Sequence, residues 1–340
     1  MKPLKCITPD QKKEDNRVLN IDWYIEFKNT EGRRYQLALL AECEIISSVD
    51  NLADTATIVL PEAVMNDPIN FENKIGRGTE VLIKMGYDNQ LETEFVGFIQ
   101  DITNSDSSLK ILCEDALFLF RVGVPDVELK PTSVTSIAQY VIDHIDASYK
   151  VECNFDVNYE KFIIHQATGY DVLKKLQDET KANIYFDTVN KVLHIHPPYI
   201  QKGGEVFYTM QKNIENSSLE YNNKLDAKVE VIVESTDVKG NVKQVSAGTT
   251  GGDKMTLKVG AMDEASMQRV ADAELIKHSS AGYEGSFDTW LVPVCKPTYS
   301  ARIKDEDYPE KTAWYYVKSV TTSLSAAGGK RTITPGIKLS

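Results

Sequence analysis

The sequence predicts an α+β protein, mainly β, built from two small β-barrels and an inserted α/β domain. Residues 80–121 alternate short apolar runs with Asn, Asp and Ser clusters, as strands joined by hairpins do. Amphipathic helical patterns follow in residues 132–180. β patterns then return, and residues 314–339 repeat the order of an aromatic-led strand, a small polar tip and a second strand. The two similar hairpins indicate two similar β units.

The composition is that of an ordinary globular protein rather than a nucleic-acid binder. The chain has 340 residues, 42% hydrophobic and 26% charged, which allows about two to four domains. Its formal net charge of −12 argues against phosphate binding, which needs an excess of Lys and Arg. The five cysteines are odd in number and far apart, so neither a disulfide framework nor a zinc ribbon is expected. The N-terminus lacks the apolar core of a signal peptide and no run is long enough to span a bilayer, so a soluble protein without membrane insertion is expected.

The first predicted barrel covers residues 1–124. Its apolar runs are short and strand-like, and closing them into a barrel would remove free strand edges. Gly97, inside one of these runs, predicts a bulge or a tight bend. The expected strands are residues 21–28, 35–40, 42–49, 55–60, 80–87, 95–102 and 109–113.

The α/β insertion is predicted over residues 125–212. Residues 134–145 place apolar side chains at i, i+3 and i+4, with Thr132 or Ser133 as the N-cap of this helix. A second helix begins near Thr168. Short strands are expected at residues 150–155, 162–165, 183–187 and 191–196.

The second predicted barrel, residues 213–340, includes one long helix. That helix covers residues 263–277, with Asp263 as its cap and Met267, Val270, Ala271, Leu275 and Ile276 as its apolar stripe. Its strands are expected at residues 225–234, 256–259, 287–292, 314–324 and 332–339.

No pattern in the sequence indicates an enzyme active site. The spacings of zinc proteases, serine hydrolases and nucleotide-binding loops are missing, and residues 76–78 are interpreted as a turn. Glu114 and Asp115 are a carboxylate pair of the kind glycosidases use, but they more simply end a strand and start the next segment. We therefore expect no catalytic residues and no cofactor.

His194 and His196 are the best candidates for a metal site. Positions i and i+2 of a strand lie on one face, which suits two imidazole ligands. His165 is the nearest further histidine in the sequence, and no third ligand is evident. Solvent-facing strand residues or an interface pair explain the two histidines better than a metal does.

The order of these elements resembles the baseplate hub proteins of contractile-tailed phages, also called late-control D-like tail hubs, and the equivalent hubs of contractile injection systems. In the N-terminal part the resemblance rests on the strand that ends in Gly86-Tyr87, the run Phe95-Val96-Gly97-Phe98-Ile99 and the hairpin that follows it. In the C-terminal part it rests on Tyr316-Val317, Ser323, Gly328-Gly329-Lys330-Arg331 and the helix 263–277 followed by Gly282-Tyr283-Glu284-Gly285. The Pro-Gly turn that the family often shows is missing around residues 297–303.

The resemblance implies a structural role in a virion tail or an injection particle that is assembled in the bacterial cytoplasm. A homotrimer of two-barrel chains would form a six-fold-like ring with a central channel, joining a hexameric tail tube protein to a trimeric spike protein among other baseplate proteins. No sequence-specific nucleic-acid binding is expected, and the channel lining should be acidic or neutral. The hairpin tips are the candidates for tube or subunit contact: Asn104, Ser105, Asp106, Ser107, Ser108, Ser325, Gly328 and Gly329.

Two other functions remain open at this point. A tail-tip hydrolase of the same fold would degrade peptidoglycan, but such proteins usually carry a separate catalytic domain, and no residues are left over for one. A carbohydrate- or receptor-binding β module would expose aromatic side chains on loops, whereas Trp23, Trp290 and Trp314 all fall in predicted strands.

Overall fold

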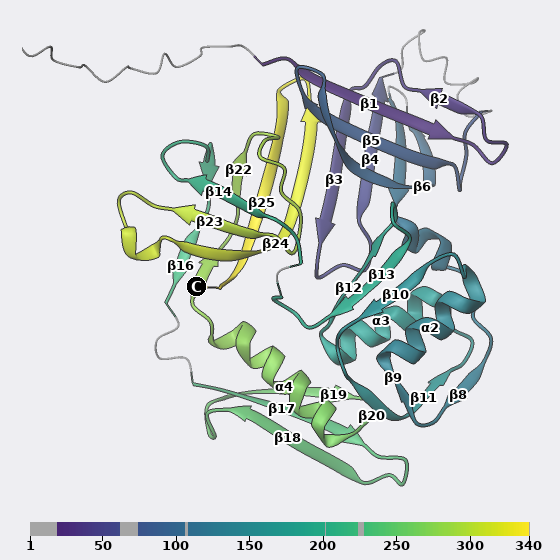
Figure 1. Ribbon diagram of the computed structural model, residues 1–340, viewed down its shortest axis with the longest axis vertical. Helices are drawn as coiled ribbons and strands as arrows, with labels where there is room; N and C mark the ends of the chain where they lie inside the picture. Colours follow the sequence, from purple (N-terminus) through teal and green to yellow (C-terminus); the bar gives the residue numbers. More distant parts are fainter. Residues whose placement is uncertain (1–18, 62–73, 106–107, 201, 224–227, 340) are drawn as a thin grey trace, which may run out of the picture.

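The computed structural model describes residues 19–61, 74–105, 108–200, 202–223 and 228–339. Two β units lie side by side, and a compact α/β region and a helix-covered sheet lie beyond them (Figure 1). The mainly β, α+β class predicted from the sequence is confirmed. None of the helices in the described ranges is both long and apolar enough to cross a membrane.

The first β unit is an antiparallel sheet in the order β3-β4-β7-β6-β5-β1-β2. The sheet curls, as Figure 1 shows. Side chains of β1 and β5 share one hydrophobic cluster with those of β3 and β4. The polar segments 50–54 and 88–89 separate strands as predicted, whereas residues 103–105 and Ser108, predicted as loop, belong to β6 and β7. The strands of this unit are β1 (Ile21–Lys28), β2 (Arg34–Gln36), β3 (Glu42–Ser48), β4 (Thr55–Pro61), β5 (Glu80–Tyr87), β6 (Gln90–Ser105) and β7 (Ser108–Glu114).

The second β unit is built around the hairpin of two long strands, β24 and β25. Tyr208, Phe287 and Tyr315 are fully buried in its own hydrophobic cluster. A short 3-10 helix, Pro309–Lys311, precedes β24. The strands are β14 (Glu205–Thr209), β15 (Asn216–Ser217), β16 (Glu220–Asn222), β21 (Gly282–Glu284), β22 (Phe287–Thr289), β23 (Ser300–Lys304), β24 (Ala313–Ser325) and β25 (Gly328–Lys338).

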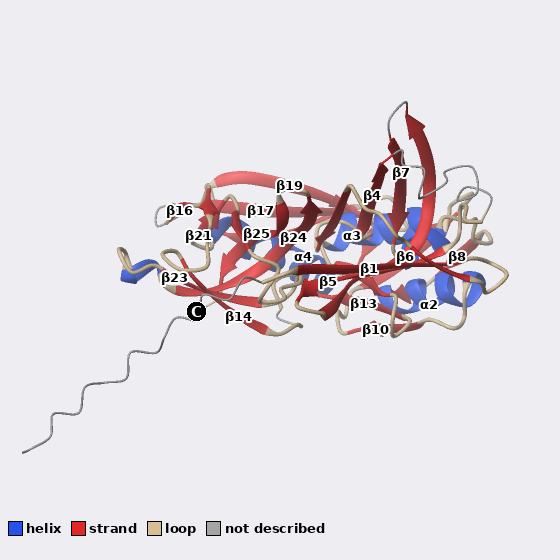
Figure 2. Cartoon of the chain, turned by 90° about the horizontal axis from the view of Figure 1, so that it is seen from above, coloured by secondary structure: helices blue, strands red, loops and turns tan. Residues whose placement is uncertain are grey.

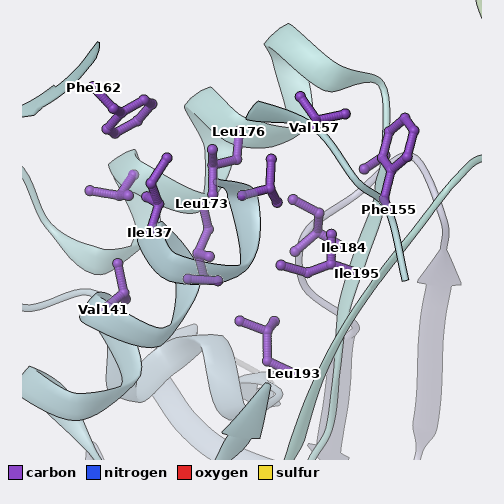
Figure 3. Close-up of a cluster of buried hydrophobic side chains, with 14 of the residues drawn as sticks. Ile137, Val141, Phe155, Val157, Phe162, Leu173, Leu176, Ile184, Leu193 and Ile195 are labelled. Atoms are coloured by element: carbon purple, nitrogen blue, oxygen red, sulfur yellow. The ribbon is translucent and has the colours of Figure 1, made fainter. Parts of the chain in front are cut away.

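The α/β region begins where the apolar run 116–120 forms a 3-10 helix. Helix α2 (Val134–Ile145) has the predicted bounds and is capped by Ser133, and α3 (Gly169–Thr180) starts at a capping box between Thr168 and Asp171. Both helices pack on β12 (Asn183–Asp187) and β13 (Val192–His196), as Figure 3 shows for their Ile, Leu and Val side chains. The remaining strands are β8 (Val127–Leu129), β9 (Thr132–Ser133), β10 (Lys150–Cys153) and β11 (Asn158–Ile164).

A three-stranded sheet covered by helix α4 (Glu264–Ser279) lies below this region in Figure 1. Asp263 caps the helix as predicted, and Met267, Val270 and Ala271 are fully buried against the sheet. Ile276 was wrongly included in the apolar stripe, because it is 46% exposed. The strands of this sheet are β17 (Val229–Thr236), β18 (Val242–Gly248) and β19 (Asp253–Val259), whereas β20 (Ala261–Met262), just before α4, pairs with β11 of the α/β region.

The two β units share one continuous sheet. Strand β24 pairs with β3 over six positions, from Ser319 opposite Ser48 to Leu324 opposite Cys43. In the described residues the path of strands runs from β15 to β2 and does not return on itself, so the predicted closed barrels are not observed there. The physical reason is that β24 changes partner along its length, from β23 to β3, and so carries the ladder into the neighbouring unit.

The bulge expected at Gly97 lies elsewhere. The register of β6 against β7 shifts between Ile99 and Asp101. Gly97 instead allows a close approach, since a Cβ there would lie 2.3 Å from the carbonyl oxygen of Glu114. The domain boundaries at residues 124 and 212 stay predictions.

Candidate functional site

The two predicted tip hairpins lie at the same end of the shared sheet. The β6–β7 hairpin closes where Ser105 faces Ser108, and Ser108 lies opposite Pro61, the last residue of β4. β4 runs antiparallel to β3, which begins at that end, and β3 in turn pairs near its start with the tip of β24. Both hairpins therefore extend the same edge, and Figure 2 shows the β6–β7 hairpin projecting from the body.

Only part of the predicted contact set can be placed. Asp106 and Ser107 lie outside the described residues. Asn104, Ser105 and Ser108 end or begin the strands that flank them. At the other tip, Ser325 ends β24 and its hydroxyl accepts a hydrogen bond from the backbone N–H of Ala327 at 3.2 Å. Gly328 and Gly329 already belong to β25, so this tip is shorter than predicted.

The two β units contain the same five-strand arrangement. In the first, the pairing order is β5-β6-β7-β4-β3, and in the second it is β23-β24-β25-β22-β15, with every pairing antiparallel. Each set also has the same order along the chain. We call these sets the first and second strand repeats. The internal similarity that the two hairpins suggested is therefore present in the strand topology.

A buried ion pair joins the two repeats. Arg331 of β25 is 1% exposed and donates to both carboxylate oxygens of Glu94 on β6, at 2.6 and 2.9 Å. It also donates to the hydroxyl of Thr322 at 2.8 Å and to the carbonyl oxygen of Leu291 at 2.9 Å. Charge pairing and these extra acceptors together compensate for burying the guanidinium group. The pair fixes how one β unit sits on the other.

A cavity of about 270 Å³ lies where both β units meet the α/β region. Its lining includes Asp54, Asp115, Tyr185, Lys296 and Arg331. The carboxylates are held by the protein itself: Asp54 accepts from the hydroxyl of Ser47 at 2.8 Å, and Asp115 accepts from the backbone N–H groups of Asp54 and Leu117. These bonds are those of a structural turn and helix cap.

The two carboxyl groups at this cavity have shifted pKa values. Burial raises the pKa of Asp54 to about 6, although the hydrogen bond from Ser47 acts in the opposite direction. Burial, and next the neighbouring charge of Asp54, raise the pKa of Asp115 well above its ordinary value. Carboxyl groups with shifted pKa values also occur in active sites, so this cavity is the first candidate for an active site. The one cysteine in the described lining, Cys295, is buried, and burial raises the pKa of its thiol to about 12; the nearby hydroxyl of Ser47 already donates to Asp54.

The histidine pair flanks a tyrosine. The ring of Tyr185 stacks on His194 with centroids 5.1 Å apart and meets His196 edge-on at 5.5 Å. His165 is separate from them, bonded to Asp126. Among the described residues there is no group of three or more His, Cys, Asp or Glu side chains suited to a metal ion. The two histidines therefore have the contacts of an aromatic cluster, and burial lowers the pKa of His196.

The pair Glu114 and Asp115 is divided between two structural tasks. Both carboxylate oxygens of Glu114 accept from Arg121, at 2.6 and 2.7 Å, while Asp115 caps the 3-10 helix that follows. The simpler interpretation of this pair, a strand end and a segment start, is confirmed.

Trp290 departs from its predicted place. It follows the last residue of β22, is 46% exposed and hydrogen-bonds through its indole N–H to Glu215. Sequence reasoning also missed Arg331, Glu94 and Asp54, the polar residues at the junction of the two units. The predicted strand began at Thr332, so Arg331 was grouped with the Gly-rich tip, and its inward direction within β25 is seen only in the structure.

No protein-family model matches the sequence, and no curated protein sequence matches it. Solved structures do match. A tail protein from Neisseria meningitidis MC58 is 13% identical, with a TM-score of 0.66 over 92% of this chain and 96% of that one. The 43 kDa tail protein of prophage MuSo2 from Shewanella oneidensis is 15% identical, with a TM-score of 0.62 over 92% and 98%.

A third match connects the fold to secretion machinery. The E. coli c3393 protein, described as a component of the type VI secretion system with structural similarity to the T4 bacteriophage tail proteins gp27 and gp5, is 12% identical. Its TM-score is 0.59, over 93% of this chain and 77% of that one. The chain thus has the fold of these tail proteins along nearly its whole length.

Proposed function

We propose that this chain is the structural hub of a phage baseplate or of an equivalent contractile injection machine. Three copies would form a ring around a central channel, with a six-fold tail tube on one side and a three-fold spike on the other. The fold shared with phage tail proteins and with a type VI secretion component supports this assignment. The role is structural rather than catalytic.

The internal repeat is the observation that carries the proposal. A three-fold spike can contact a six-fold tube uniformly only if three chains present six similar surfaces. The two strand repeats have the same strand order and the same antiparallel pairings, so each chain would supply two such surfaces. Because both tip hairpins lie at the same end of the sheet, three chains would present six tips in one direction.

We assign the tube-facing side to those tips, which include Ser108 and Ser325. Large side chains there should block tail assembly without changing the hub's own oligomeric state. The variant Ser108→Trp with Ser325→Trp tests this, scored by electron microscopy of tails in the virus or particle that carries the protein. Glu310→Trp, at an exposed residue of the short helix before β24, is the control. Normal tails from the double variant would contradict the assignment.

The oligomeric state tests the hub itself. Light scattering of the purified protein should give three times the 38.1 kDa chain mass. A monomer at every concentration would contradict the proposal. The same preparation should leave peptidoglycan undigested, and digestion abolished by Asp115→Asn would favour a hydrolase instead.

A further inference from the structure

The internal contact between the two units, β3 with β24, has an equivalent pair of strands, β15 and β6, that do not pair within one chain. Inside the chain, β3 of the first repeat pairs with the tip half of β24 of the second, over Ser319–Leu324. The repeat places β15 where β3 stands and β6 where β24 stands. The outer edge of β15 and the tip half of β6 should therefore meet in the same way, but within one chain they are separated along the strand path by β22, β25, β24, β3, β4 and β7.

Both edges are open in the described residues. β5 pairs with β6 only as far as Phe98, and the loop before β5 extends this pairing to Ile99, through bonds with Gly78 and Thr79. Beyond Ile99 no described strand lies on that side of β6. β15 pairs with β22 on one side and ends the strand path on the other.

The directions of the backbone N–H and carbonyl groups also show which residues of β6 and β15 face the open edges. In the hairpin, Ser105, Thr103 and Asp101 face β7, so Ile102 directs its N–H and carbonyl to the open side. Its N–H bonds to the adjacent Asp101 carboxylate at 2.9 Å instead of to a strand. Just after β15, the N–H of Ser218 donates to the carbonyl of Ser286, the residue before β22, so Ser217 directs its backbone groups outward by the same alternation.

We infer that the tip half of β6 in one copy pairs antiparallel with β15 of the next copy. The register follows from the internal contact, where Thr322 faces Ile45 and Ser323 faces Glu44. Superposing the repeats by their hairpins makes Ile102 equivalent to Thr322 and Thr103 to Ser323, while β15 aligns Ser217 with Ile45 and Asn216 with Glu44. Ile102 thus faces Ser217 of the next copy, and Thr103 faces its Asn216.

The pairing is heterologous, so the same contact repeats from copy to copy and closes into a ring only at a fixed number of chains. It also places Asp101 opposite Ser218 and Asn104 opposite Glu215, so that no like charges face each other across the ladder. The inference rests on the proposed trimer, because it names which strands join one copy to the next.

Disulfide cross-linking tests the register. Opposite residues of an antiparallel ladder have Cα atoms about 4.5–5.5 Å apart, within the range that a disulfide spans. Thr103 and Asn216 are exposed; Cys43, Cys113 and Cys295 are buried, Cys153 is half-buried and Cys6 lies outside the described residues, so the native protein under the same oxidation gives the background. Under mild oxidation, Thr103→Cys with Asn216→Cys should convert the protein into a covalent trimer on a non-reducing gel. Mixing the two single variants should give a covalent dimer.

In the matched control, the cysteine on β6 is replaced by one on the adjacent strand β7. Lys110 lies directly opposite Thr103 on β7, is also exposed, and is about 4.8 Å farther from the edge. Lys110→Cys with Asn216→Cys should stay monomeric on the gel. If light scattering gives a trimer but the Thr103 pair cross-links no more than this control, the register is wrong and the hub proposal stands. A protein that is monomeric at every concentration overturns both.

Discussion

Arg331 on β25 and Glu94 on β6 form a two-bond ion pair whose side chains are only 1% and 4% exposed. The pair lies between the two strand repeats, where it is also bonded to Thr322 and to the backbone of Leu291. Its burial makes it a constraint on the relative position of the two β units.

Removing one partner of this pair should strongly destabilise the protein. Arg331→Met leaves the Glu94 carboxylate buried without its counterion, which should lower the free energy of unfolding by about 3–5 kcal/mol. Chemical denaturation monitored by tryptophan fluorescence measures this.

The double variant and a surface pair are the controls for Arg331. Arg331→Met with Glu94→Leu should be markedly more stable than Arg331→Met alone, since no charge is then left buried. Lys28→Met breaks the exposed pair between Lys28 and Glu80 and should cost about 1 kcal/mol or less. Equal losses for Lys28→Met and Arg331→Met would show that the buried pair has no special role.

The raised pKa of Asp54 predicts a pH-dependent stability. Between its ordinary pKa of 3.8 and its folded pKa of about 6, the folded chain holds more of the Asp54 proton than the unfolded chain does. This contribution to the free energy of unfolding is therefore fully present below pH 3.8 and is lost as the pH rises through about 6. Asp54→Asn should remove the loss, so its stability relative to the native protein should increase from pH 4 to pH 7.

A second variant should change this pH dependence in the opposite direction. The hydroxyl of Ser47 donates to Asp54 at 2.8 Å and lowers the pKa of Asp54 against the effect of burial. Ser47→Ala should therefore raise that pKa further and steepen the loss of stability. Denaturant unfolding at a series of pH values compares the three proteins. The prediction fails if Ser47→Ala and Asp54→Asn shift the curve in the same direction.

Gly97 should not tolerate a side chain. A Cβ at this position would lie 2.3 Å from the carbonyl oxygen of Glu114 and 2.6 Å from the ring of Phe95. Gly97→Ala should therefore lower the free energy of unfolding by about 1–3 kcal/mol, as overpacking does. Gly123→Ala is the control, because no heavy atom lies within 4 Å of its Cβ position. Similar melting temperatures for the two variants would refute the close approach.

A buried hydrogen bond links the α/β region to the second β unit. The amide of Asn183 on β12 donates to the hydroxyl of Tyr316 on β24 at 2.8 Å, and both residues are buried. Tyr316→Phe leaves the amide unpaired and should cost about 1–3 kcal/mol. Tyr283→Phe removes a buried hydroxyl that has no hydrogen-bond partner among the described residues, so it should be neutral or slightly stabilising. The melting temperatures of the two variants, measured by thermal unfolding, test this difference.

The local elements could be predicted from the sequence because their signals are local. Helix α2 follows its i, i+3, i+4 pattern from Val134 to Ile145, and α4 begins after the predicted cap Asp263. The β24–β25 hairpin was expected from its aromatic-led strand and Gly-rich tip. The strand prediction near residue 290 extended too far, because an exposed Trp has the same apolar signature as a buried one.

The long-range pairings could not be predicted in this way. Nothing in the periodicity of β3 indicates that β24, from the other end of the chain, is its partner, nor that β14 pairs parallel to β23. A hydrophobic pattern identifies which face of a strand is buried but not which strand lies beside it. The polar residues at the junction could not be predicted for the same reason, because Glu94 and Arg331 come together only when the two β units pack against each other.

The β3–β24 ladder also constrains the timing of synthesis on the ribosome. The edge of β3 emerges early, whereas its partner is translated after most of the chain has been made. A nascent chain thus carries an unpaired β3 edge until β24 has been translated and can pair with it. Truncated chains that lack β24 would keep the unpaired edge of β3. They would be open to aggregation and proteolysis before they could enter a particle.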